Sequence, residues 1–150
     1  MGCPIIAHAQ PRQSAVIGFL GANTASVQRP YTDALTKRLG DRGWVEGSNL
    51  TVEYRWAEGR YDRSPSLVTE LVERKVDVIV THAPQNVVAA KRVTSEIPIV
   101  FAAVGDPVGV GVVASLARPG DNVTGLSLQS ADLASKRLEL LWELSPAVRR

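Results

Sequence analysis

The residues best suited to chemistry lie in three loops, each placed directly after an apolar segment. These loops are residues 21–26, 81–85 and 103–107. Their hydroxyl, amide and carboxylate groups, together with the backbone N–H groups that small residues leave accessible, suit the binding of a carboxylate or a phosphate. The same residue types are what a tight turn between a strand and a helix requires, so each loop alone also has a purely structural explanation.

Motifs typical of enzymes are incomplete in this chain. His82 is the only histidine after residue 13, and no G-x-S-x-G nucleophile turn accompanies it. Residues 109–114 match the letters of the G-x-G-x-x-A dinucleotide fingerprint, but that fingerprint must directly follow the first strand of a βαβ unit, and this segment follows a later one. An enzyme or nucleotide-binding domain therefore stays the alternative to simple ligand binding, and we expect no cofactor.

Composition narrows the class of protein further. The chain has 150 residues, 45% of them hydrophobic and 21% charged, which is typical of one globular domain with a real core. Its 17 Lys and Arg against 15 Asp and Glu give a net charge of only +2, and the positive residues are scattered, so nucleic acid is a poor candidate partner. One cysteine, Cys3, and two histidines exclude an internal disulfide and a His-rich metal site.

The hydrophobic pattern alternates between strand-like and helix-like segments. Short apolar or alternating runs predict five strands, at residues 15–20, 50–56, 76–80, 97–102 and 122–128. Helical spacing predicts a helix after each, with Pro30 in the first turn of one, Ser64 and Asn86 as N-caps of two others, and a short helix after Pro107. The last helix carries an apolar stripe from Leu133 to Leu144.

Such alternation predicts an α/β fold, a doubly wound and mostly parallel five-stranded sheet with helices on both faces. We expect the strand order 2-1-3-4-5. In an open sheet of this kind the ligand lies outside the carboxyl ends of the strands, where the strand order reverses, and this is where the three polar loops belong. The aromatic residues of one short region, Trp44, Tyr54, Trp56 and Tyr61, are expected to pack around the edge strand.

Residues 1–13 do not resemble the start of a core. Ala7-His8-Ala9 has the small-x-small form that precedes a signal-peptide cleavage site, but the charged and long apolar regions of a complete signal are missing. Two interpretations stay open, a residual secretory signal or a disordered tail. The first predicts a periplasmic protein, and the second, with a genuine start codon, a cytoplasmic one.

Several segments together resemble one protein family. They are residues 17–21, 43–50, 53–59, 76–81, 98–102, 105–108, 115–120 and 122–125. With these segments the chain resembles the ABC transporter substrate-binding proteins of the tryptophan/tyrosine type from about residue 15 to the end. The resemblance implies one lobe of a type I periplasmic binding protein, whose members have two similar α/β lobes that close on a small ligand.

The resemblance also implies domains, partners and a site. Residues 14–146 would form the N-terminal lobe, 1–13 the tail, and 147–150 the start of a hinge or second lobe. The partners would be an amino-acid-like solute and a membrane permease, with no metal and no catalysis. By loop position the ligand-binding residues would be Asn23, Thr24, Thr81, His82, Gly105 and Asp106. Because one lobe supplies one wall of such a pocket, weak binding is expected of this chain alone. A gene fragment without present function is a further open interpretation.

Overall fold

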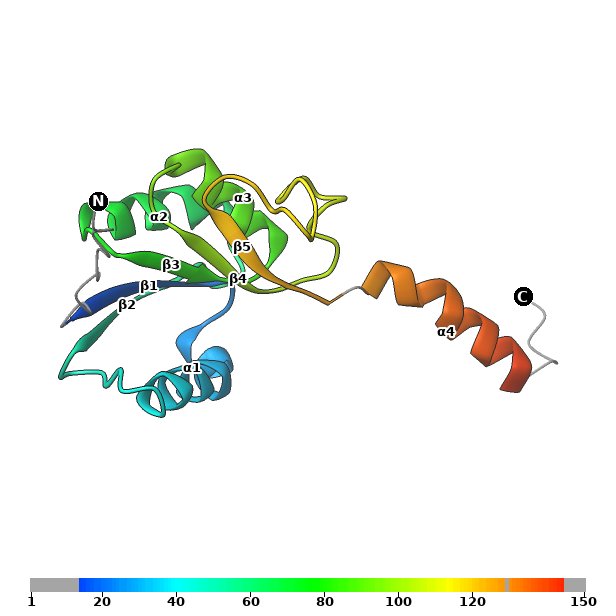
Figure 1. Cartoon of the computed structure of the whole chain (residues 1–150), viewed down its shortest axis with the longest axis horizontal. Coiled ribbons are helices and arrows are strands. Elements are labelled where there is room, and N and C mark those ends of the chain that lie inside the picture. The colour runs from blue at the N-terminus through cyan, green and yellow to red at the C-terminus, as the bar shows by residue number, and fades with distance from the viewer. Residues whose placement is uncertain (1–13, 129, 145–150) are drawn as a thin grey trace, which may run out of the picture.

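A five-stranded parallel sheet forms the centre of the computed structural model, which describes residues 14–128 and 130–144 (Figure 1). Its strands are β1 (Ala15–Gly21), β2 (Leu50–Trp56), β3 (Val78–Thr81), β4 (Ile99–Val104) and β5 (Val123–Ser127). The order across the sheet is β2-β1-β3-β4-β5, and all neighbouring strands are parallel. The predicted fold class and strand order are both confirmed.

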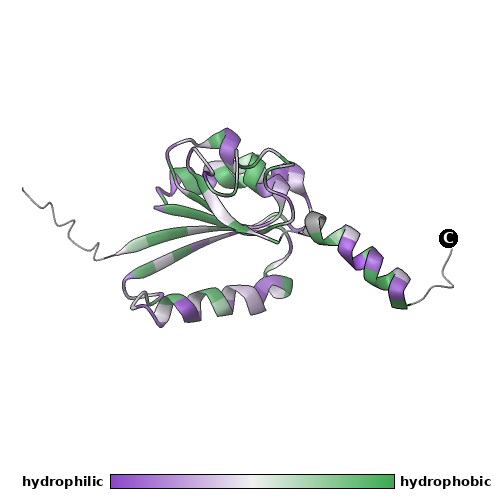
Figure 2. Ribbon diagram, turned by 45° about the vertical axis from the view of Figure 1, so that its right-hand side comes forward, coloured by the Kyte–Doolittle hydropathy of each residue, from purple (hydrophilic) through white to green (hydrophobic). Residues whose placement is uncertain are grey.

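Helices cover the two faces of the sheet unequally. The helical segments are α1 (Ala25–Gly40), the short 3-10 helix η1 (Tyr61–Arg63), α2 (Ser64–Glu73), α3 (Pro84–Val93) and α4 (Ser130–Leu144). Figure 1 shows α2 and α3 on one face, α1 on the other, and α4 projecting away from the sheet. Exposed leucines and Trp142 give α4 much of its apolar surface, visible as green bands in Figure 2.

The hydrophobic core lies between the sheet and the pair α2 and α3. Leu20 from β1, Ile79 from β3 and Ile99 from β4 are fully buried there, and they meet Val68 and Leu71 of α2. Burial of each such side chain contributes about 1.5–3 kcal/mol to the free energy of unfolding. This apolar layer fixes the strands, and thereby fixes where their carboxyl ends lie.

A buried polar network joins four elements at the carboxyl edge of this core. The Leu20 carbonyl at the end of β1 accepts a hydrogen bond from Thr81 Oγ1 of β3 at 2.7 Å and a longer one from Asn86 Nδ2 of α3 at 3.5 Å. Asn86 Oδ1 in turn accepts from Ser64 Oγ, the first residue of α2, at 2.7 Å. Ser64, Thr81 and Asn86 are fully buried, so these bonds replace the water that each side chain loses.

The predicted helix caps at Ser64 and Asn86 are therefore wrong. Neither residue precedes its helix, because α2 begins at Ser64 after η1 and α3 begins at Pro84. Both are polar residues that usually serve as caps, but here they satisfy each other between two packed helices. The sequence gives no sign of that pairing, which depends on how α2 and α3 pack.

Two other predictions about helices are wrong. The helix expected to start around Pro30 begins five residues earlier, at Ala25, and contains Pro30 in its second turn. Pro30 has no backbone N–H, so α1 lacks one intrahelical hydrogen bond at this point. The short helix expected after Pro107 is a series of turns instead, in which Asp106 Oδ1 accepts from Gly109 N at 2.8 Å and Val112 N bonds the Pro107 carbonyl at 2.8 Å.

Strand boundaries differ from the prediction by up to two residues. β3 and β4 begin two residues later than expected, at Val78 and Ile99, whereas β2 agrees at both ends. Asp77 precedes β3 and already pairs with β1, since its backbone N donates to the Val16 carbonyl at 2.8 Å. The predictions for residues 1–13 and 147–150 lie outside the described residues, and the boundary at 146 does too.

Removal of the Ser64 hydroxyl tests the buried network. In Ser64→Ala, Asn86 Oδ1 loses its donor in a site closed to water, so we expect a loss of about 1–3 kcal/mol in the free energy of unfolding, measured by urea denaturation. Ser66→Ala is the matched control, because Ser66 is exposed in the same helix and its hydroxyl donates to the Arg63 carbonyl at the surface. Equal effects of the two substitutions would contradict the importance of the network.

Candidate functional site

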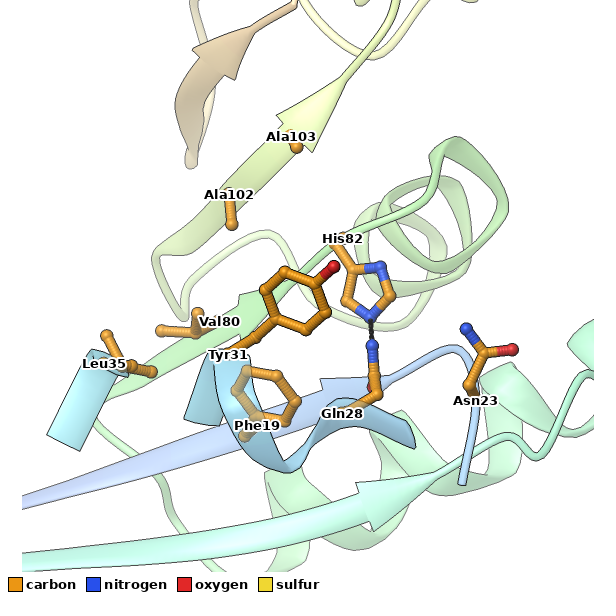
Figure 3. Close-up of a pocket in the computed structure, with 9 residues that line it drawn as sticks. All are labelled: Phe19, Asn23, Gln28, Tyr31, Leu35, Val80, His82, Ala102 and Ala103. Carbon is orange, nitrogen blue, oxygen red and sulfur yellow. Dashed lines mark hydrogen bonds between the residues drawn. The ribbon is translucent and has the colours of Figure 1, made fainter. Parts of the chain in front are cut away.

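A pocket of about 400 Å³ lies on the α1 side of the sheet, toward the carboxyl ends of the strands (Figure 3). The described residues that line it come from β1, α1, β3, β4 and the loops after β1 and β3. They are Phe19, Asn23, Gln28, Tyr31, Leu35, Val80, His82, Ala102 and Ala103. The volume falls within the range of small-molecule sites, about 300–1,000 Å³.

The topology explains why the pocket forms here. β1 lies between β2 and β3, so the chain leaves β1 toward one face and leaves β3 toward the other. This is the reversal of strand order at which open α/β sheets bind their ligands. From α1, Gln28, Tyr31 and Leu35 reach the pocket at three- and four-residue spacing, which is one face of the helix.

His82 is the central polar group of the pocket. Its Nε2 accepts a hydrogen bond from the backbone N–H of Ala22 at 3.2 Å, and the side-chain amide nitrogen of Gln28 contacts the same atom (Figure 3). A backbone N–H and an amide NH₂ only donate, so Nε2 must carry the lone pair of a neutral ring. Burial lowers the pKa of His82 below its ordinary value, because the charged ring would lose hydration, and the neutral form is therefore favoured.

Gln28 is held in a tight space. The side chain is only 4% exposed, and its Oε1 is buried without a hydrogen-bond partner among the described residues. A Cβ on Gly21 would collide with this oxygen and with the ring of Trp56. The end of β1 therefore requires glycine for close approach, and that glycine allows Gln28 to reach His82.

The backbone after His82 is strained. Ala83 has a φ of 68°, a left-handed backbone angle that residues other than glycine rarely adopt. Such residues cost about 1–3 kcal/mol and persist only where their surroundings enforce them. Here Ala83 makes the sharp turn from β3 into α3. Thr81 and His82 are consecutive at the end of β3, so side-chain alternation places Thr81 in the core and His82 at the pocket.

Aromatic rings form the floor of the pocket and continue into the edge strand. The Phe19 ring lies 5.9 Å from Tyr54 and 5.5 Å from Trp56 between ring centroids, and Tyr54 and Trp56 stack at 5.8 Å with 7° between their planes. The packing role expected for the aromatic residues is thus confirmed for Tyr54 and Trp56. On the pocket side, the Phe19 centroid is 6.5 Å from that of His82.

The six residues predicted for the site divide into two groups. Asn23 and His82 line the pocket together. The other four do not line it: Thr81 is buried with its hydroxyl on the Leu20 carbonyl, Thr24 pairs with Ser26 at 3.0 Å, and Asp106 caps the turn that follows Gly105. A role in ligand binding stays a prediction for all six.

Sequence reasoning missed the remaining lining residues. Gln28 falls in a predicted loop because the helix is expected to start at Pro30, whereas the structure starts it at Ala25. Tyr31 and Leu35 lie on the apolar face of the predicted helix, a pattern that indicates packing as readily as ligand contact. Phe19 and Val80 belong to the strands themselves, and their alternate positions along β1 and β3 point them to the α1 side. Apolar residues in a strand carry no sign of whether they face a core or a ligand.

The structure also limits other kinds of site. Within residues 14–128 and 130–144 no group of three or more His, Cys, Asp or Glu side chains is placed to hold a metal ion. None of the helices in this described part of the chain combines the length and apolar character needed to cross a membrane.

The fold is an α/β domain with a pocket at the topological switch point, where open sheets of this kind bind ligands. Residues 24–150 match the family described as ABC transporter substrate binding protein. The chain belongs to this family.

Relatives and solved structures agree with that assignment. The chain is 36% identical over 129 residues to a tyrosine-binding protein of Clostridioides difficile, covering 83% of this chain but 36% of that protein. A conserved domain protein from Vibrio cholerae superposes with a TM-score of 0.77 at 31% identity, covering 89% of this chain and 45% of the other. A domain from Streptococcus pneumoniae in complex with L-Trp gives a TM-score of 0.69 at 25% identity, with 76% and 38% covered. The chain thus spans less than half the length of these proteins.

Gly21→Ala tests the close approach at the end of β1. The added methyl group must displace Gln28 or Trp56, so we expect a loss of about 1–3 kcal/mol in the free energy of unfolding by urea denaturation. Gly40→Ala is the matched control, since nothing lies within 4 Å of a Cβ there. Alanine at this position should be neutral or add up to about 1 kcal/mol. An unchanged stability of Gly21→Ala would show that the pocket wall is looser than described.

The lowered pKa of His82 predicts a dependence of stability on pH. The unfolded chain binds a proton to this residue near pH 6.5, whereas the folded chain binds it only at lower pH. The contribution of neutral His82 is therefore fully present above about pH 6.5 and decreases as the pH falls below that value. Urea denaturation at about pH 7.5 and about pH 5 should show a larger decrease for the wild type than for His82→Gln, which cannot titrate. Equal decreases in the free energy of unfolding of the two proteins would contradict a lowered pKa at His82.

Proposed function

We propose that this chain is the ligand-recognising part of a solute-binding component of an ABC import system, with an aromatic amino acid as its cargo. The observation that carries the proposal is the pocket at the switch point, in which the Phe19 and Tyr31 rings stand beside the polar groups of Asn23, Gln28 and His82. A small solute with an aromatic part and a polar end complements such a surface.

The relatives support the same class of cargo. The Clostridioides difficile relative is described as tyrosine-binding, and the solved Streptococcus pneumoniae domain is a complex with L-Trp. Membership in the substrate-binding family supports a membrane permease as the partner that receives the solute, and a location outside the cytoplasmic membrane, in the periplasm, where such a component meets its cargo.

The proposed mechanism is capture without chemistry. His82 is the one imidazole among the described lining residues, and its Nε2 already accepts from the Ala22 N–H and contacts the Gln28 amide. A ring held in this way lacks a free lone pair for proton abstraction. Its function in the proposal is to present a fixed polar group to the ligand.

Titration followed by NMR tests the proposal directly. ¹⁵N-labelled protein is titrated with L-tyrosine, L-tryptophan, L-phenylalanine and, as a control, L-alanine, while the Gln28 side-chain amide and the His82 amide report on the pocket. We expect saturable shifts with the aromatic amino acids and none with L-alanine. NAD and ATP belong in the same panel, and shifts with these two alone would favour the nucleotide-binding alternative.

Tyr31→Ala is expected to weaken the binding of L-phenylalanine by about tenfold, because one aromatic wall of the pocket is removed. Tyr31 is 71% exposed, so the fold should not change. The matched control is Tyr61→Ala, since Tyr61 is 40% exposed and lines a separate hollow beside Pro65 and Pro84. Equal losses in both variants, or none in Tyr31→Ala, would exclude this wall as the binding surface.

A further inference from the structure

The proton of the His82 ring has a defined position. Because Nε2 accepts from the Ala22 N–H, a neutral ring must carry its proton on Nδ1. No hydrogen bond of Nδ1 is found among the described residues, and Nδ1 is not one of their buried unpaired atoms, so it is accessible on a residue that lines the pocket. The pocket therefore presents a fixed hydrogen-bond donor that the folded chain leaves unused.

The rest of the lining contains no group that would bind a cation by charge. None of the nine described lining residues is Asp or Glu, and Asp106, on the neighbouring loop, is occupied by its own turn at Gly109 N. Asn23 is exposed beside the pocket, and its amide can donate as well as accept. A ligand ammonium would find no charged partner among these lining side chains, whereas a ligand carboxylate would find the donors of His82 and Asn23.

We infer that this wall of the pocket selects an aromatic carboxylate through His82 Nδ1–H and does not recognise the amino group of an amino acid. The inference rests on the proposed function and narrows it to the class of aromatic carboxylic acids, with or without an α-amino group. A hydrogen bond from a neutral donor to a carboxylate is stronger than one between neutral groups, because the acceptor is charged. The aromatic rings then bind the other end of the ligand.

Three soluble ligands of the same ring and chain length separate the two charged groups. They are L-phenylalanine, 3-phenylpropanoate, which lacks the ammonium, and phenethylamine, which lacks the carboxylate. In NMR titrations at about pH 7.5, where His82 is neutral, we expect the first two to bind within about threefold of each other and phenethylamine to bind about tenfold more weakly. The His82 Nδ1 resonance should move with the two acids and not with the amine.

Two substitutions test whether His82 is the source of this preference. His82→Gln places an amide oxygen near the former Nε2, where it can accept from the Ala22 N–H, but it removes the Nδ1–H donor. It should lose about tenfold in affinity for 3-phenylpropanoate and little for phenethylamine. His82→Asn places an amide donor near the former Nδ1 and should retain the preference for the acid. The thermal unfolding midpoint of each variant establishes that it folds. If one variant does not fold, the shift of the His82 Nδ1 resonance in the wild type tests the inference in its place.

The outcomes distinguish this inference from the proposed function. Binding of L-phenylalanine with about tenfold weaker binding of 3-phenylpropanoate would overturn the inference and leave the proposed function standing. An acid preference that persists unchanged in His82→Gln would overturn the role of His82. If none of the three compounds moved any resonance of the folded wild type, the inference and the proposed aromatic cargo would both be wrong.

Discussion

One carbonyl group holds the carboxyl edge of the sheet together. The Leu20 oxygen, buried at the end of β1, receives the hydroxyl of Thr81 and the amide of Asn86, and Asn86 receives the hydroxyl of Ser64. β1, β3, α2 and α3 are therefore joined by polar bonds in a place closed to water, where a missing partner is costly. The pocket is built directly on the opposite side of the same strands, so its geometry depends on this network being complete.

The polar groups of the pocket are held in place by contacts within the chain. Gly21 admits the Gln28 side chain, Gln28 and the Ala22 N–H fix the ring of His82, and the chain turns sharply at Ala83 directly after it. None of these contacts involves a ligand. A site whose polar groups are already ordered loses less conformational entropy when a solute binds than one that must order them at that moment.

The sequence allowed much of the scaffold to be predicted and only part of the site. The α/β class follows from the alternation of apolar segments, and the edge that carries the pocket follows from the rule for open sheets; neither depends on particular side chains. Ser64 and Asn86 were misassigned because cap residues and a buried polar pair have the same composition, and only packing distinguishes them. Gln28 was missed for a local reason, since the predicted helix starts at Pro30 and the actual one at Ala25. Tyr31 was missed because an apolar residue on a helix face gives no sign of whether it packs or binds.

Thr81 and His82 are neighbours in the chain, yet they belong to opposite faces of the sheet, one bonded inside the core and the other open to the pocket. Mutations at these two positions are therefore subject to different selection. A change at 81 acts on the stability of the core, and a change at 82 acts on the shape and polarity of the pocket. Variation of the pocket among descendants of such a domain can thus proceed through single codons on one side of a strand while the other side is held by the core.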